Sequence, residues 1–437
     1  MSRLLVRRSA TAVGIYLSVA LGFLATIVAG RELSGLRSFG DYSTVIFATG
    51  FFQALFDLTV EEAVVKYGFR YVAREDWGRL RRLFQSALGF KGLGSALGGV
   101  GLVVFGFVGP HRLETALFVA AAIPLGQSLE GLAGTSLYLR GRYDIRSAFL
   151  TWSMVLRLVG VGVGAHYGLV PAVVGVLLGQ LLSTASVGTA GWLAFHRFPQ
   201  TPAKPLAEDR RGIVSFFIQS SVGTGVISLR SGLVPLLLGA VTTTKQVGLF
   251  KIAQAPQSGF LALSAPARMV LLTEQTRDWE QGRQSAVLRG VRRYTAAAAV
   301  LMVVAVPPLY IWMPWLVAHV YSAKYAPASN AARVFLLAAA VQMLVGWTKS
   351  FPVAVGRPNL RIITHGLESA VILPLVIPLG LYYGATGAAI AVFAGMCAFA
   401  LVWWVIFART EPTDVGRPPS MEEALAQEDG EAEVLAH

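Results

Sequence analysis

Charged residues are scarce in this chain. Of its 437 residues, 14% are charged and 54% are hydrophobic, whereas charged residues make up roughly a quarter of ordinary soluble domains. A soluble protein of this length needs a polar surface, and this composition cannot cover one. The sequence therefore excludes an ordinary soluble protein and favours one that lies largely in lipid.

Motifs of catalysis and metal binding are also missing. The single cysteine, Cys397, excludes an internal disulfide framework and a cysteine-rich metal site. The chain has no Walker ATP-binding sequence, no His-Glu-x-x-His and no Gly-x-Ser-x-Gly. We therefore predict no catalytic residue, no metal and no cofactor, and a chain that is not an enzyme.

The charge that is present is mostly positive. The formal net charge is +13, which in a soluble protein would indicate nucleic-acid binding. In a membrane protein, Lys and Arg instead collect in the cytoplasmic loops, so we predict no nucleic-acid partner.

The hydrophobic residues come in runs of about 20, the length of helix that crosses a hydrocarbon layer roughly 30 Å thick. Backbone groups in lipid must satisfy their own hydrogen bonds, so such runs form helices. We predict an all-α polytopic membrane protein with about twelve transmembrane helices, at 9–30, 41–66, 83–108, 114–139, 145–165, 171–195, 212–239, 248–271, 291–312, 331–354, 361–382 and 387–408.

The loops between these spans differ in charge. One alternate set, which includes both termini, holds 26 of the 37 Lys and Arg residues. Because positive loops stay in the cytoplasm, we predict that both termini are cytoplasmic.

The two halves of the chain resemble each other. Tyr167-Gly168 precedes the sixth span as Tyr383-Gly384 precedes the twelfth, and Phe39–Tyr42 answers Val247–Phe250. Six spans per repeat is an even number, so both halves enter the membrane in the same direction, as a parallel repeat. We predict two six-helix lobes around a central cavity, with the N-terminal lobe at 1–195, a cytoplasmic linker at 196–211, the C-terminal lobe at 212–408 and an acidic, disordered tail at 409–437.

Cations inside the spans are the main functional signal. A charge at the membrane centre costs roughly 2.5–3.5 kcal/mol on insertion scales, so it normally faces a polar cavity or a partner. Arg157 and Arg230 are the deepest cations, one in each half, and neither has an acidic residue close by in its own span. Guanidinium groups grip phosphates with two hydrogen bonds, so we predict that an anionic substrate binds between the lobes. The predicted anion-binding set is Arg157, Arg230, Arg31, Lys91 and Lys349.

Ion pairs within each half are an alternative for the lysines. Lys91 could pair with Glu130, and Lys349 with Glu368. The acidic residues Asp57, Glu61 and Glu130 could instead bind a coupling ion, H⁺ or Na⁺, although a local ion pair explains the Asp57 and Glu61 region equally well.

Several motifs resemble a known family. They are Ala29–Leu33 at the end of the first span, Phe39–Ser43, Phe56–Tyr67, Val247–Ala253 and Tyr321–Ala332. They are similar to motifs of bacterial polysaccharide-repeat-unit flippases, in the multidrug/oligosaccharidyl-lipid/polysaccharide exporter superfamily. The chain departs from the family pattern at Gly30 and Thr59.

The resemblance implies a transporter of the bacterial plasma membrane. It would move an undecaprenyl-diphosphate-linked oligosaccharide from the inner to the outer leaflet by alternating access, for cell-surface polysaccharide synthesis. Its partners would be the lipid-linked glycan, membrane lipid and polysaccharide assembly proteins. An ion-coupled multidrug exporter of the same superfamily, or a polymerase, ligase or scaffold of polysaccharide assembly, is the alternative.

Overall fold

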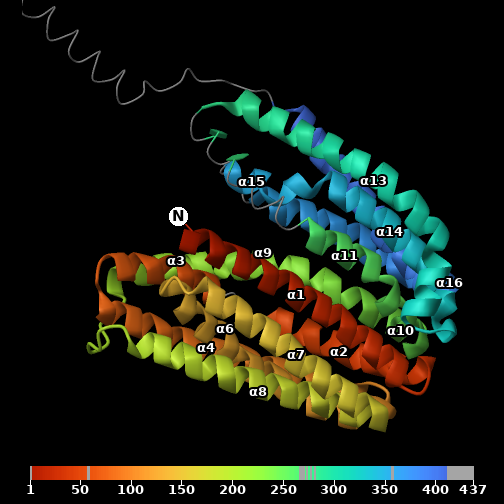
Figure 1. The fold of residues 1–437 in the computed structure, drawn as a ribbon, viewed down its shortest axis with the longest axis horizontal. Helices are drawn as coiled ribbons and strands as arrows, with labels where there is room; N and C mark the ends of the chain where they lie inside the picture. Colours follow the sequence, from red (N-terminus) through yellow and green to blue (C-terminus); the bar gives the residue numbers. More distant parts are fainter. Residues whose placement is uncertain are drawn as a thin grey trace, which may run out of the picture.

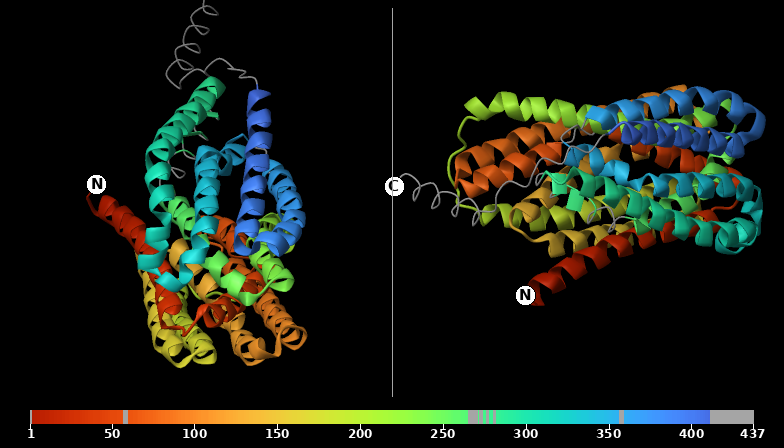
Figure 2. Two further views of the ribbon diagram at one scale, coloured as in Figure 1. Left: turned by 90° about the vertical axis from the view of Figure 1, so that its right-hand side faces the viewer. Right: turned by 90° about the horizontal axis from the view of Figure 1, so that it is seen from above.

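The computed structural model describes residues 2–56, 60–264, 271, 274–275, 278–279, 282–355 and 359–410. Within these ranges, the helical side chains at 2–10, 208, 219–220, 222–224, 226–230, 263 and 353–354 are not described. The described backbone is helical almost throughout and holds no strand. The helices run along one common direction, as the helices of a membrane protein do (Figures 1 and 2).

The described residues of the first half form eight helices. They are α1 (Ser2–Glu32), α2 (Leu36–Phe56), α3 (Val60–Ala73), α4 (Trp77–Val108), α5 (His111–Ala120), α6 (Ala122–Leu139), α7 (Tyr143–Tyr167) and α8 (Leu169–His196). α2 and α3 form one span bent by 45°, and α5 and α6 together form another.

The second half is more broken. It comprises α9 (Ala207–Val241), α10 (Thr244–Ala253), α11 (Ala255–Leu263), α13 (Gln284–Val320), the 3-10 helix η1 (Ala323–Ala328), α14 (Ser329–Leu344), the 3-10 helix η2 (Gly346–Lys349), α15 (Phe351–Ala354) and α16 (Asn359–Ala408). Prolines at 235, 307, 308, 314, 374 and 378 lie within these helices. A proline removes a backbone hydrogen bond and permits a kink.

The described helices occupy each of the twelve predicted ranges, but not as twelve uninterrupted spans. Among the described residues, seven helices are long and apolar enough to cross a membrane, or eight if the bent pair α2 and α3 counts as one span. The long helix α16 contains a non-helical residue at Gly384, where the predicted eleventh and twelfth spans meet. Two further predicted ranges, 248–271 and 331–354, are divided among shorter helices in the described structure.

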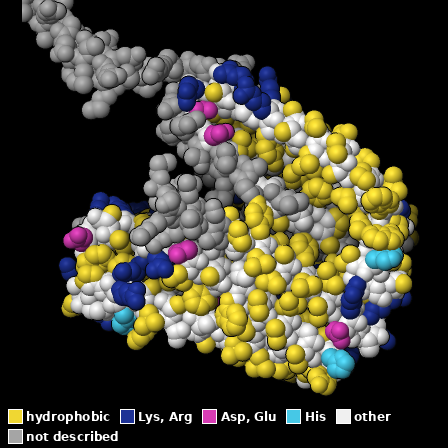
Figure 3. All heavy atoms as spheres, viewed as in Figure 1, with side chains coloured by type: hydrophobic (Ala, Val, Ile, Leu, Met, Phe, Trp, Pro, Cys, Tyr) yellow, Lys and Arg dark blue, Asp and Glu magenta, His cyan; other side chains and the backbone are white. Residues whose placement is uncertain are grey.

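The two halves form two lobes in a V (Figure 1). They meet at the end of the molecule that holds Gly40, Thr244 and Tyr325, which we call the closed end. They diverge at the opposite end, where the N-terminus lies, which we call the open end. The space-filling surface is hollowed between the lobes at the open end, and Lys and Arg gather mainly there (Figure 3).

Hydrophobic side chains cover most of the remaining face in Figure 3. Val108 and Val303 are 82% and 73% exposed. Such exposure is unfavourable in water and ordinary against lipid tails. The chain is a multi-pass membrane protein.

The internal repeat is visible in the backbone. Gly168 and Gly384, which the sequence pairs, both have positive φ, at 118° and 57°. Both stand at the closed-end turn before the last helical segment of a lobe. Residues with side chains rarely adopt such φ values, so each glycine is needed for its turn.

The segment between the lobes is shorter than predicted. α8 ends at His196 and α9 begins at Ala207, so only 197–206 is non-helical of the linker expected at 196–211. The charged residues after Ala207 belong to the predicted linker, but in the structure they form the first turns of α9. The acidic tail from Glu411 lies outside the described residues.

Candidate functional site

Two adjoining cavities lie beside the interface between the lobes. The carboxylate cavity, of about 270 Å³, is lined by Glu61, Glu130 and neighbouring polar residues. The lysine cavity, of about 290 Å³, reaches Lys251 on α10. Both are lined by Gln53, Gln127, Met154 and Arg157, so Arg157 connects them.

The lysine cavity contains one cation from each half of the chain. Arg157 comes from α7 and Lys251 from α10. The Lys251 ammonium lies 4.8 Å from the centre of the Phe47 ring, a cation–π contact. Among the described residues, neither cation forms an ion pair with a carboxylate. The cavity therefore holds two basic side chains that no carboxylate of the described residues pairs with.

A chain of side chains holds Arg157 in place. Arg157 donates to the Gln180 Oε1 at 3.2 Å, and the Gln180 Nε2 donates to Glu130 at 2.7 Å. Gln180 also donates to Thr184. The buried Glu130 thus fixes which end of the Gln180 amide faces Arg157, because only the amide oxygen accepts a hydrogen bond.

The charges of the carboxylate cavity are paired. Lys91 lies 2.7 Å from Glu61, and Arg146 lies 3.8 Å from Glu130. The Arg146 Nε has no hydrogen-bond partner among the described residues. Four cations line the two cavities against two carboxylates, and pairing leaves Arg157 and Lys251 in excess.

Two glycines on α6 make room for these pairs. A Cβ on Gly131 would overlap the Glu61 carboxylate, and a Cβ on Gly134 would overlap the Arg146 guanidinium. The missing side chains let the ion pairs approach α6 closely. These glycines therefore allow the ion pairs of the carboxylate cavity to form.

The structure gives Lys91 a different partner from the one that the sequence suggested. Lys91 pairs with Glu61 on α3, while Glu130 accepts hydrogen bonds from Gln180 and Ser183 and lies 3.8 Å from Arg146. The Lys91–Glu130 alternative is therefore wrong, because the bend between α2 and α3 brings Glu61 against α4 and α6. Lys91 and both glutamates nevertheless line the carboxylate cavity.

Other predicted residues lie elsewhere. Lys349 belongs to η2 and lines neither cavity, and the Glu368 carboxylate lies 2.9 Å from the His365 ring. Asp57 lies outside the described residues, and so does the side chain of Arg230, whose backbone is part of α9. Among the described side chains, no group of three His, Cys, Asp or Glu could hold a metal ion.

Arg31 helps to close the molecule. It donates to the backbone oxygens of His319 and Val320 at 2.6 and 2.9 Å, at the C-terminal end of α13. Helix ends leave carbonyls without partners, and a cation there is favourable. Arg31 lines neither cavity.

Further contacts hold the closed end. Tyr325 donates to the buried Gly30 oxygen at 2.7 Å, and Arg112 joins Asp41 at 3.1 Å and Thr244 at 2.8 Å. Burial raises the pKa of the Tyr325 hydroxyl, so it stays protonated and remains a donor. Every one of these groups has its partner within the protein.

Backbones also touch at the closed end. A Cβ on Gly40 would overlap the Thr244 carbonyl, and one on Gly248 would lie 3.0 Å from the Gly40 Cα. Gly40 and Gly248 are the equivalent residues of the two repeats. The two repeats therefore contact each other through equivalent residues.

Sequence reasoning missed Lys251 and Arg146 as site residues. Both lie near the start of a predicted span, at 145–165 and 248–271, where the hydropathy pattern does not distinguish a site residue from a loop residue. Lys251 lies within the Val247–Ala253 motif, three residues after a glycine at the lobe contact, and that spacing is the signal that could have marked it.

Comparisons with known proteins agree with this architecture. No family model matches the chain, and no curated protein sequence matches it. An inward-facing multidrug resistance MATE family transporter of the MOP superfamily matches with a TM-score of 0.67 and 14% identity, over 88% of this chain and 93% of that one. The lipid II flippase MurJ, in an inward closed conformation, matches with a TM-score of 0.68 and 13% identity, over 92% and 87%.

The chain shares its fold with these solved structures. An MOP superfamily transporter from Pyrococcus furiosus, described by the reverse polarity of its binding pocket, matches with a TM-score of 0.62 and 13% identity, over 92% of this chain and 94% of that one. An outward-facing MATE transporter gives a TM-score of 0.61, below the 0.67 of the inward-facing one. By these scores the chain resembles the inward-facing structure more closely than the outward-facing one.

Proposed function

We propose that this protein flips an anionic, phosphate-bearing lipid across the membrane, and specifically an undecaprenyl-diphosphate-linked oligosaccharide destined for the cell surface. The observation that carries the proposal is the pair Arg157 and Lys251. They come from opposite halves, line one cavity and have only neutral partners among the described residues. Uncompensated cations in a low-dielectric site favour a negatively charged ligand.

The fold suggests how the cargo moves. The basic open end is the cytoplasmic end by the positive-inside rule, so the present conformation faces inward and both termini are cytoplasmic. The diphosphate would bind between Arg157 and Lys251 while the lipid tail stays in the bilayer. Separation of the closed end and approach of the lobes at the open end would then expose the site to the outer side, in the plasma membrane of a bacterium.

Flipping in proteoliposomes tests the proposal. Arg157→Gln and Lys251→Gln should each slow the flipping of a fluorescent undecaprenyl-diphosphate-linked glycan by about ten- to hundredfold, because hydrogen bonds to charged groups contribute roughly 1.5–3 kcal/mol. Lys245→Gln is the matched control, since Lys245 is an exposed lysine on the same helix that lines neither cavity. Normal flipping by well-folded Arg157→Gln and Lys251→Gln proteins would refute the proposal.

Export of cationic drugs is a second candidate. Glu61 and Glu130 line the carboxylate cavity, and carboxylates can bind cations. The similarity to a multidrug transporter is as close as that to a flippase. Efflux of a cationic dye that falls in Glu61→Gln, with no glycan flipping in the unmodified protein, would favour this function.

The same carboxylates are our candidates for a coupling ion. Each is paired with a cation in this conformation, so a proton or Na⁺ would have to compete with Lys91 or Arg146. Dependence of flipping on an imposed H⁺ or Na⁺ gradient, and its loss in Glu61→Gln, would support coupling at this site. Polysaccharide assembly proteins would be the partners that receive the flipped glycan.

A further inference from the structure

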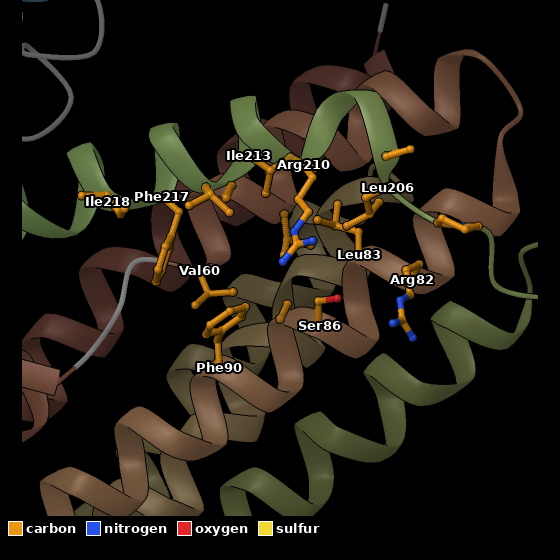
Figure 4. Close-up of a pocket in the computed structure, with 16 residues that line it drawn as sticks. Val60, Arg82, Leu83, Ser86, Phe90, Leu206, Arg210, Ile213, Phe217 and Ile218 are labelled. Atoms are coloured by element: carbon orange, nitrogen blue, oxygen red, sulfur yellow. The ribbon is translucent and has the colours of Figure 1, made fainter.

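A third cavity lies apart from the transport site. It is a groove of about 670 Å³ between α3, α4 and the first turns of α9 (Figure 4). It shares no lining residue with the carboxylate or lysine cavity. We call it the α4–α9 groove.

The groove is apolar along its length and basic at one end. The rings of Phe90 and Phe217, whose centres are 5.8 Å apart, lie at the other end (Figure 4). Arg210 runs from α9 into the groove toward α4, and Arg82 stands at its rim (Figure 4). Eight residues separate Arg82 from Phe90 on α4, a rise of about 12 Å.

The two arginines are uncompensated among the described residues. Both are exposed and neither has an ion-pair or hydrogen-bond partner there. Two nearby arginines are paired instead: Arg70 and Arg79 both lie within 4 Å of Asp209 at the start of α9. Asp209, the residue before Arg210 in the chain, is thus already paired with two other arginines.

The groove also opens toward lipid. Phe90 and Ile218 at its margin are 49% and 53% exposed, and Phe90 belongs to α4, which is long and apolar enough to cross a membrane. A soluble anion would not account for the apolar walls, and a neutral hydrocarbon chain would not account for two arginines. A molecule with both an apolar chain and a negative head matches the whole groove.

We propose that the α4–α9 groove binds one anionic phospholipid from the leaflet at the open end. Its phosphate group lies at Arg210 and Arg82, and one acyl chain lies along Leu83 to the Phe90 and Phe217 rings. Because α3 and α4 belong to the first half and α9 to the second, the lipid bridges the lobes beside the linker. This binding does not depend on what the protein transports.

Lipid titration of the purified full-length protein tests the site. After delipidation in detergent, bound phosphatidylglycerol is counted by native mass spectrometry, with phosphatidylcholine in parallel. We expect one tightly held phosphatidylglycerol, whose binding weakens about tenfold in Arg210→Gln and less in Arg82→Gln. Arg211→Gln is the matched control, since Arg211 is the next residue on α9, is exposed and does not line the groove.

A second variant tests the shape of the groove without changing its charge. Ser86→Phe would fill the groove between Leu83 and Phe90 without removing a charge, and it should also displace the bound lipid, with an unchanged melting temperature as the check of folding. Equal binding of phosphatidylcholine, or equal phosphatidylglycerol binding by Arg210→Gln and Arg211→Gln, would overturn the proposal. Displacement of phosphatidylglycerol by undecaprenyl diphosphate, together with slower flipping in Arg210→Gln, would reassign the groove to the transported lipid and also overturn it.

Discussion

The halves of this chain approach each other at the closed end and at the lysine cavity. The cations in these two places have different kinds of partner. At the closed end, Arg31 and Arg112 bind carbonyls, a carboxylate and a hydroxyl of the protein. In the lysine cavity, Arg157 and Lys251 have an amide and an aromatic ring. A cation that the protein satisfies holds the structure together, whereas one left with neutral partners can bind a ligand.

The largest expected effect concerns the backbone contact. In Gly40→Leu, the new side chain would meet the Thr244 carbonyl. Overpacking of this kind costs up to about 3 kcal/mol, which would shift the population away from the closed form by about a hundredfold. Gly35→Leu is the control, because a Cβ there has nothing within 4 Å.

Distances across the closed end measure this shift. Spin labels at Ser34→Cys and Lys245→Cys, in a Cys397→Ser background, report the separation of two exposed positions on opposite halves. Wild-type distances in Gly40→Leu would mean that the glycine contact does not control closure.

Loss of the Gln180 amide should weaken ligand binding and leave the closed end unchanged. Gln180→Leu removes the hydrogen bond that holds Arg157 and leaves Glu130 without its closest donor. A hydrogen bond to a charged group contributes about 1.5 kcal/mol or more, so the KM for flipping should rise about tenfold with unchanged spin-label distances. Gln85→Leu, an exposed glutamine on α4, should leave KM unchanged, and an equal rise there would remove the distinction between the regions.

Tyr325→Phe should weaken the closed end without touching the ligand site. It leaves the buried Gly30 carbonyl without its donor, at a cost of about 1 kcal/mol. We expect an about fivefold larger open population by spin labelling and little change in KM. Tyr382→Phe is the control, since Tyr382 is 83% exposed, and identical distances in both variants would show that this bond contributes nothing.

Arg31→Gln should have the smallest effect. Its two hydrogen bonds to α13 are exposed, so we expect an about twofold change in closed-end opening, from roughly 0.5 kcal/mol, and an unchanged KM. Arg37→Gln, at an exposed position on α2, serves as the control. A large rise in KM for Arg31→Gln alone would restore Arg31 to the substrate-binding set.

Part of the site was predictable from the sequence, because the position of a cation within an apolar run indicates how deep it lies in the membrane. Arg157 could be chosen because an arginine in the middle of an apolar run is costly unless a cavity or partner receives it. Lys251 and Arg146 lie near the ends of apolar runs, where a cation can reach water at little cost, so hydropathy could not separate them from loop residues. Their role depends on which way α10 and α7 face.

What the sequence by itself determined was the set of helices and their repetition. Local hydrophobicity sets where a backbone must form a helix in lipid, and the paired glycines at 168 and 384 set matching turns. The tertiary structure alone decided which charges meet, as with Lys91 and Glu61, and which stay unpaired, as with Arg157 and Lys251. A charge partner is fixed by the packing and bending of helices distant in the chain, and no local property of the sequence encodes that geometry.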